Sequence, residues 1–175
     1  DMGDADIVHT DTFKSHKNIE FAVKCALNAG SLPVIIGGDH SINIPCINAY
    51  EGQQHFHVLQ VDAHLDFVDE RHGVKFGHGN PMRRAAEKDY VFGLTQLGIR
   101  NVSSTAKEGY EQARLMGSDI ISVRQARHMG MVNVVNRIPK NERLYISIDI
   151  DAFCLSIEPG TGTTLDMKRF DRGST

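Results

Sequence analysis

The chain has 175 residues, a formal net charge of −3 and 23% charged residues, a length and composition typical of one globular domain. No basic cluster indicates nucleic-acid binding, and no run approaches the roughly 20 apolar residues that a membrane-spanning helix needs. The three cysteines, Cys25, Cys46 and Cys154, form no Cys-x-x-Cys pair, which predicts reduced thiols rather than disulfides or a thiolate zinc site. We therefore expect a cytoplasmic protein that acts on a small molecule.

The chain begins in a way that resembles the interior of a domain, with Asp1-Met2-Gly3-Asp4 and no signal peptide. We expect residues 1–175 to form a single domain that is incomplete at both ends. Apolar runs alternate with amphipathic stretches, the pattern of an α/β protein with a parallel sheet.

The first amphipathic stretch, Ser15–Ala29, carries one apolar stripe and ends at Gly30. Two later helix-like stretches, Thr105–Met116 and Gln125–Arg137, are less regular. Short, mostly apolar runs predict strands that are covered on both faces. The predicted strands are Pro33–Gly38, His57–Ala63, Thr95–Arg100, Asp119–Arg124 and Leu144–Ile150.

Polar clusters follow three of these strands, at the ends where open parallel sheets collect ligands. They are Gly37-Gly38-Asp39-His40-Ser41, Asp62-Ala63-His64-Leu65-Asp66 and Ser147-Ile148-Asp149-Ile150-Asp151. Residues two apart in extended backbone face the same side, so one short segment can present several ligands. Two imidazoles and four carboxylates suffice for two divalent cations if carboxylates bridge them, and this donor set favours Mn²⁺ over Zn²⁺. The predicted metal ligands are His40, Asp62, His64, Asp66, Asp149 and Asp151.

These clusters predict a binuclear metallohydrolase. Without cations, four converging carboxylates would repel one another, and some of their pKa values would rise. Two divalent cations remove that cost and make a shared water acidic next to a bound electrophile, so the implied reaction is hydrolysis. His78, in the loop Gly77–Pro81, is a candidate proton shuttle at the mouth of the site.

Each cluster also has a simpler interpretation when it is taken alone. Asp39 could cap a helix at a strand-to-helix turn, Asp149 and Asp151 could be a solvated strand end, and His78 could be a structural loop residue. The coincidence of three clusters at three strand ends favours the metal site. The other histidines are predicted to be ordinary surface or partly buried residues; they are His9, His16, His55, His57, His72 and His128.

The order of these motifs resembles the ureohydrolase family, which includes arginase, agmatinase and guanidinobutyrase. The match runs from about Pro33 to Thr163 and includes the His-Gly loop and Pro159-Gly160-Thr161-Gly162-Thr163. The loop His78–Ala85 and the segment Leu97–Arg100 are more similar to the agmatinase branch than to arginase.

The resemblance implies a three-layer α/β/α domain with a mostly parallel sheet, the arginase-like fold, and homo-oligomers built from it. It implies two Mn²⁺ per subunit, one held by His40, Asp62, Asp66 and Asp149 and the other by His64, Asp62, Asp149 and Asp151. His78 matches the family's proton-shuttling histidine. The implied reaction cleaves a guanidino group to urea and an amine: agmatine would give putrescine and urea, and a guanidino acid, as in guanidinobutyrase, is the alternative substrate.

The chain departs from the family pattern near its end. Cys154-Leu155 stands where the family has a further Asp-Pro, Thr164–Arg169 replaces Pro-x-Pro-Gly-Gly, and the family's guanidinium-binding glutamate would lie beyond this point. Substrate-binding residues are therefore unknown, and a catalytically weak domain that only binds a partner or oligomerises is an alternative. Metallophosphoesterases also use Asp-x-His, but they place it before Gly-Asp-x-x-Asp and Gly-Asn-His, whereas Pro81 follows Gly79-Asn80 here.

Overall fold

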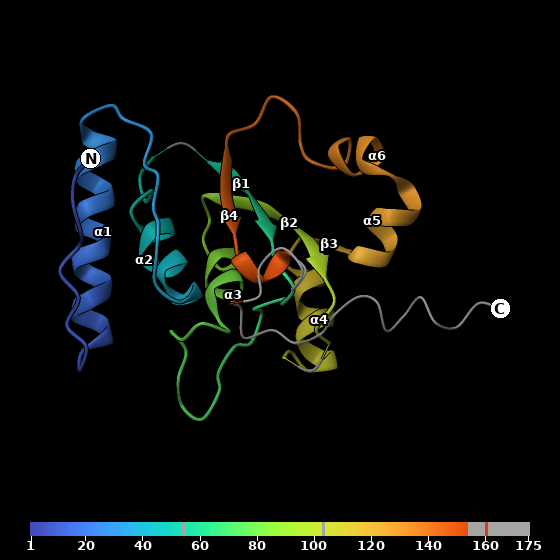
Figure 1. Ribbon diagram of the computed structural model, residues 1–175, viewed down its shortest axis with the longest axis horizontal. Coiled ribbons are helices and arrows are strands. Elements are labelled where there is room, and N and C mark those ends of the chain that lie inside the picture. Colours follow the sequence, from blue (N-terminus) through green and yellow to red (C-terminus); the bar gives the residue numbers. More distant parts are fainter. Residues whose placement is uncertain (54, 103, 154–159, 161–175) are drawn as a thin grey trace.

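The computed structural model describes residues 1–53, 55–102, 104–153 and 160. Strands and helices alternate along these residues (Figure 1). The strands are β1 (Phe56–Val61), β2 (Val91–Ile99), β3 (Ser118–Ser122) and β4 (Leu144–Ile148). The α-helices are α1 (Thr12–Asn28), α2 (Asn43–Asn48), α3 (Pro81–Ala86), α4 (Lys107–Leu115), α5 (Val123–Met129) and α6 (Met131–Val135). The 3-10 helices are η1 (His40–Ile42) and η2 (Ile150–Ala152).

The strands form one parallel sheet in the order β3-β2-β1-β4. Because all strands run the same way, their carboxyl ends meet at one edge of the sheet. Val61, the last residue of β1, pairs with Ile148, the last residue of β4. The residues that follow them, Asp62 and Asp149, therefore leave the sheet side by side.

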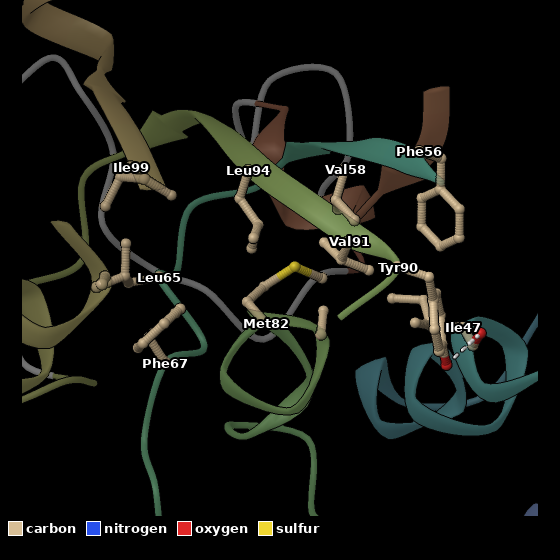
Figure 2. Packing of buried hydrophobic residues seen from close by; sticks show 12 residues of the cluster. Ile47, Phe56, Val58, Leu65, Phe67, Met82, Tyr90, Val91, Leu94 and Ile99 are labelled. Atoms are coloured by element: carbon tan, nitrogen blue, oxygen red, sulfur yellow. Dashed lines mark hydrogen bonds between the residues drawn. The ribbon is translucent and has the colours of Figure 1, made fainter. Parts of the chain in front are cut away.

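The larger hydrophobic core fills the space between one face of the sheet and the helices α2, α3 and α4. Met82 extends from α3 toward Leu94 and Val91 of β2, and both Met82 and Leu94 are fully buried (Figure 2). Burying an apolar side chain of this size stabilises the fold by roughly 1.5–3 kcal/mol. A smaller apolar cluster joins α1 to α2.

Next to β3, α5 packs against β2 and β3, and α6 packs against α5 (Figure 1). Along the sheet, the chain moves in one direction from β1 to β3 and in the other direction from β3 to β4. Right-handed connections therefore place α5 and α6 on the face opposite to α3 and α4. Away from β3 this face is open, because Ile146 and Ile148 of β4 are 56% and 63% exposed. The predicted three-layer α/β/α fold with a mostly parallel sheet is confirmed.

The predicted strand Pro33–Gly38 is wrong. Val34 and Ile36 are 80% and 93% exposed, and the segment belongs to no strand of the described sheet. A groove of about 1240 Å³ is lined by this segment on one side and by β4 on the other. An apolar run indicates a tendency to extend, but a strand also needs a neighbour whose backbone groups it can pair with.

Local capping chemistry explains the other differences in element bounds. The predicted strand Asp119–Arg124 ends early because the Ser122 side chain accepts a hydrogen bond from the Gln125 backbone and starts α5 with a capping box. The predicted helix Gln125–Arg137 is divided between α5 and α6 at Gly130, whose φ is 78°. Asp11 caps α1, which begins at Thr12, three residues before the predicted start of that helix.

The structure also bears on the expectations about membranes and cysteines. None of the helices in the described ranges has the length and apolarity that a membrane crossing requires. Cys25 and Cys46 are free thiols. The expectations for Cys154, for Thr164–Arg169 and for Pro159–Thr163 apart from Gly160 lie outside the described residues.

Two leucines of contrasting exposure test the core. Leu94 is 0% exposed and Leu115, at the end of α4, is 78% exposed. We expect Leu94→Ala to lower the free energy of unfolding by about 2–5 kcal/mol, because it removes buried contacts and leaves a cavity. Leu115→Ala should cost less than about 1 kcal/mol. Urea unfolding measures both, and equal losses would contradict this assignment of the core.

Candidate metal centre

Asp62 leaves β1 at the carboxyl edge of the sheet and is 0% exposed. Its backbone N–H still bonds to the Leu97 carbonyl at 3.0 Å, and Gly98 permits this close approach, since a Cβ there would lie 2.9 Å from the Asp62 carbonyl oxygen. Asp62 Oδ1 accepts a 2.6 Å hydrogen bond from the His64 backbone. The chain therefore bends at Asp62, and the expectation that extended backbone aligns three ligands on one face is wrong.

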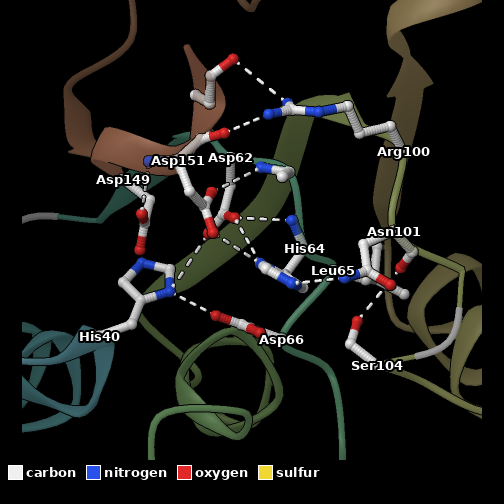
Figure 3. Close-up of polar contacts among 12 residues, drawn as sticks. His40, Asp62, His64, Leu65, Asp66, Arg100, Asn101, Ser104, Asp149 and Asp151 are labelled. Carbon is white, nitrogen blue, oxygen red and sulfur yellow. Dashed lines mark hydrogen bonds and ion pairs between the residues drawn. The ribbon is translucent and has the colours of Figure 1, made fainter. Parts of the chain in front are cut away.

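Asp66 reaches the site because its backbone adopts a left-handed conformation, with φ at 49°. Aspartate tolerates this region better than most residues do. The turn sends Leu65 and Phe67 into the core, where they are 0% and 1% exposed. The Asp66 carboxylate instead faces His40, with Oδ2 2.5 Å from Nδ1 (Figure 3).

His40 comes from the opposite side of the site, at the start of η1. Asp39 caps this short helix by accepting from the Ser41 backbone at 2.8 Å, as the simpler interpretation predicted. Gly38 allows the tight entry, because its φ is 69° and a Cβ would lie 2.7 Å from an Ile42 methyl carbon. The His40 ring nevertheless points into the site: Nδ1 lies 3.2 Å from Asp62 Oδ2, besides its contact with Asp66.

Asp149 and Asp151 arrive from β4 through η2. Asp149 Oδ1 accepts from the Asp151 backbone at 2.9 Å. Asp151 Oδ1 accepts from the Ala63 backbone at 3.1 Å, and its Oδ2 lies 2.8 Å from His64 Nδ1. Asp151 is only 7% exposed and Asp149 is half-buried, so Asp151 does not belong to a solvated strand end.

Ligand atoms of five predicted metal ligands form two compact groups. His40, Asp62 and Asp149 make the first, and Asp62, His64 and Asp151 make the second; within each, the ligand atoms lie within 4.8 Å of one another. Asp62 belongs to both groups, as a bridging carboxylate must. The structure puts Asp149 in the first group, and Asp66 contacts that group through His40.

Burial and mutual repulsion raise the pKa values of two carboxyls. Burial is the main cause that lifts the pKa of Asp62 to about 6, and the charge of Asp66 adds to it, while His64 and His40 oppose the rise. Burial also raises the pKa of Asp149, with the charges of Asp151 and Asp66 acting in the same direction. Carboxylates held this close together in a poorly solvated site repel one another, and nearby positive charge reduces that repulsion.

The two histidines supply that charge as protons. Hydrogen bonds to Asp151 and Asp62 raise the pKa of His64 to about 10 against the effect of burial. Burial alone would lower the pKa of His40, but the bond to Asp66 and the charges of Asp62 and Asp149 raise it overall. Imidazole nitrogens that face carboxylate oxygens are also the donors that Mn²⁺ accepts, so the residues present fit two such ions.

His78 lies exposed at the groove that contains the site. Asn80 holds its loop, since its side chain accepts from the Gly77 backbone at 2.9 Å and donates to the Val68 carbonyl at 2.7 Å. Burial would raise the pKa of Asp39, which lines the same groove, but hydrogen bonds with Ser41 lower it overall, and the charge of His78 acts in the same direction. This position leaves His78 outside both donor groups and open to solvent.

The remaining histidines lie elsewhere. His57 is 6% exposed and its Nε2 lies 2.9 Å from Thr95 Oγ1, so it is more buried than predicted. Exposed positions are occupied by His9, His55, His72 and His128, and His16 is half-buried.

Sequence reasoning missed four polar side chains that support the site. Gln60 donates to Asp62 Oδ2 at 2.6 Å and accepts from Gln96. Asn101 Nδ2 lies 2.8 Å from His64 Nε2. The Arg100 guanidinium donates to the carbonyls of residues 151–153 (Figure 3). A glutamine inside each of two apolar strands was the available signal for Gln60 and Gln96, because a buried amide needs a partner.

The fold and the two donor groups together define an α/β protein with a candidate two-metal site. The arginase family model matches residues 1–166, and the chain belongs to the arginase family. The chain is 32% identical over 170 residues to human mitochondrial guanidino acid hydrolase, covering 93% of this chain and 48% of that protein. It is 31% identical to guanidinobutyrase of Pseudomonas aeruginosa, covering 93% and 53%, and 31% identical to agmatinase of Pyrococcus horikoshii, covering 83% and 51%.

Solved structures show the same likeness. Formimidoylglutamase from Bacillus subtilis superimposes with a TM-score of 0.83 at 31% identity, covering 93% of this chain and 53% of that one. Agmatine ureohydrolase of Thermoplasma volcanium gives a TM-score of 0.76 at 26% identity, covering 89% and 52%. The chain spans about half the length of the curated relatives it matches.

The pKa of His64 offers a test of the site in chelator-treated protein. Because Asp151 and Asp62 raise that pKa from 6.5 to about 10, we expect the His64 ring to stay protonated between pH 6.5 and pH 8. A raised pKa contributes stability that is complete below about pH 6.5 and is lost as the pH rises through about 10.

Imidazole ¹⁵N shifts, assigned with His64→Gln, measure this titration. Asp151→Asn should lower the His64 pKa, whereas Asp69→Asn, an exposed acid paired with Arg84, should leave it unchanged. A His64 ring that titrates near 6.5 in the wild type would contradict the hydrogen bond to Asp151.

Proposed function

We propose that this protein cleaves a guanidino group to urea and an amine at a centre of two Mn²⁺ ions. The observation that carries the proposal is the arrangement around Asp62, whose two carboxylate oxygens face different donor groups in a chain of the arginase family. Asp62 Oδ2 lies 3.2 Å from His40 and Oδ1 lies 3.7 Å from His64. A carboxylate placed in this way is suited to hold two cations together.

The proposed ligands are those expected from the sequence. His40, Asp62, Asp66 and Asp149 would hold one ion, and His64, Asp62, Asp149 and Asp151 the other. When bound, such ions would supply Lewis acidity, which makes a water more acidic and stabilises negative charge that develops on the substrate. His78, at the mouth of the groove, would carry a proton to the leaving amine. We also propose homo-oligomers and a cytoplasmic location.

Agmatine is the proposed substrate, with putrescine and urea as products. Asp39 lines the groove beside the site and is not one of the proposed metal ligands, so its carboxylate is available to attract a cationic guanidinium compound. The likeness to an agmatinase and the resemblance of the His78–Ala85 loop to that branch support this choice.

A guanidino acid is the second candidate. Two of the relatives described above are named as a guanidino acid hydrolase and a guanidinobutyrase. Arg71 lines the same groove, where its guanidinium donates to the Ser104 carbonyl at 2.7 Å, and it could pair with the carboxylate of such a substrate.

Paired histidine variants test the metal site and the proton shuttle together. We expect His64→Ala to lose bound manganese, because it removes a ligand. His78→Ala should keep both ions and lower the rate of urea release by about 10²–10⁴-fold, the usual contribution of a general acid or base. Manganese content by elemental analysis and urea release are measured on the same samples. If His78→Ala empties the site, His78 is a ligand; if it changes neither quantity, it is a loop residue.

A substrate panel tests the reaction. We expect urea release from agmatine or 4-guanidinobutyrate to exceed that from arginine at least tenfold, equivalent to about 1.4 kcal/mol in transition-state free energy. Arg71→Ala separates the two candidates: it should weaken turnover of the guanidino acid and spare agmatine, which has no carboxylate. A preference for arginine, or phosphatase activity without urea, would refute the proposal.

A further inference from the structure

A chain of buried polar side chains crosses three strands and ends at Asp62. Ser118 of β3 donates to Gln96 Oε1 at 2.5 Å, Gln96 Nε2 donates to Gln60 Oε1 at 2.6 Å, and Gln60 Nε2 donates to Asp62 Oδ2 at 2.6 Å. Gln60 and Gln96 are register partners on β1 and β2 and are both 0% exposed. Ser118 is 8% exposed. Solvent therefore has little access to this chain.

The direction of every hydrogen bond in the chain is fixed by its surroundings. Gln96 Nε2 lies between two carbonyl oxygens, those of the Gln60 side chain and the Leu65 backbone, both at 2.6 Å. Gln60 Nε2 lies between the Asp62 carboxylate and the His64 carbonyl, the latter at 3.2 Å. Rotating either amide would place oxygen against oxygen. All donors therefore point toward Asp62.

The same amides also hold the backbone that carries the other ligands. Gln60 bonds to the carbonyl of His64 and Gln96 to the carbonyl of Leu65, so the bend after β1 is attached to the sheet at two points. Each amide uses both of its hydrogens in this way. Two apolar side chains could fill the same volume, but they would take these donors away from the His64 and Leu65 carbonyls and from Asp62 Oδ2. Packing alone therefore does not explain the two glutamines.

The consequence for Asp62 is a fixed carboxylate plane. Oδ2 is held by Gln60 and Oδ1 by the His64 backbone at 2.6 Å. With both oxygens held, Oδ2 faces His40 and Oδ1 faces His64. A carboxylate free to turn would lose one of these two directions.

We propose that Gln60, supported by Gln96 and Ser118, is a positioning residue that keeps the Asp62 carboxylate oriented toward both metal positions. The inference rests on the two-metal site of the proposed function, though not on its substrate. Hydrogen-bond partners of metal ligands typically contribute 10–100-fold to metal affinity. Because Asp62 is shared, loss of this support should weaken both ions together.

The test compares variants by Mn²⁺ affinity, using equilibrium dialysis with elemental analysis and the electron paramagnetic resonance spectrum of the exchange-coupled ion pair. Gln60→Met keeps the side-chain length and removes the donor. We expect both ions to bind about 10–100-fold more weakly, with loss of the coupled spectrum at limiting metal. Gln96→Met should weaken binding in the same direction, and the double variant should lose less affinity than the two single losses combined, since part of the Gln96 effect acts through Gln60.

Thr95→Val is the matched control. Thr95 is a 1% exposed neighbour of Gln96 on β2, and its hydroxyl bonds to His57 rather than to the chain that ends at Asp62. It should lower the unfolding temperature as any lost buried hydrogen bond does, and leave Mn²⁺ affinity within about twofold of the wild type. Ser118→Ala, which removes only the far end of the chain, serves if Gln60→Met does not fold, with an expected loss of about two- to tenfold.

The outcomes separate the inference from the proposed function. Gln60→Met or Ser118→Ala with wild-type affinity, or Thr95→Val with an equal loss, would overturn the positioning role alone. A wild-type protein that binds two Mn²⁺ but releases no urea would refute the proposed reaction and leave the inference standing. A wild-type protein that binds no Mn²⁺ would overturn both.

Discussion

A carboxylate that water cannot reach is the constraint around which this structure is arranged. Asp62 is 0% exposed, and an unpartnered charge at such a position would cost several kcal/mol. Its partners are His40 of η1, which is distant in the sequence, and two near neighbours, Gln60 of β1 and the His64 backbone N–H. Burial still raises the pKa of Asp62 to about 6. Divalent cations bound beside Asp62 would supply further positive charge to the site.

The parallel sheet is what makes this convergence possible. The register that pairs Val61 with Ile148 brings the ends of β1 and β4 together, and the Asp149 backbone bonds to the Val61 carbonyl at 2.9 Å. The core beneath, with Leu65 and Phe67 buried in it, fixes the chain just beyond Asp62. A small change in the strand register or in the core packing would separate ligands that must lie within a few ångströms of one another. The packing of the sheet therefore determines the geometry of the site.

Much of this organisation could be predicted from the sequence, and the failures have identifiable causes. Apolar runs that end in acidic clusters identified β1 and β4. Ligand atoms of His40, Asp62 and Asp149, which were expected at one edge of the sheet, lie close together in the structure. The prediction of a strand at Pro33–Gly38 failed because a strand must pair with a neighbouring strand, and no local sequence pattern specifies that neighbour. The role of Gln60 was missed for the same reason: its meaning depends on Gln96, thirty-six residues away, which only the register reveals.

Capping and metal binding, which looked like competing interpretations of the aspartates, are compatible. The same local device recurs in all three clusters: Oδ1 of an aspartate accepts the backbone N–H two residues later, at Asp39, Asp62 and Asp149. Each such bond turns the chain where it enters or leaves the site. At Asp62 this bond fixes Oδ1, while Oδ2 faces the His40 imidazole. A carboxylate with one oxygen fixed by its own backbone has lost much of its rotational freedom before any cation arrives, so less entropy is lost when it binds one.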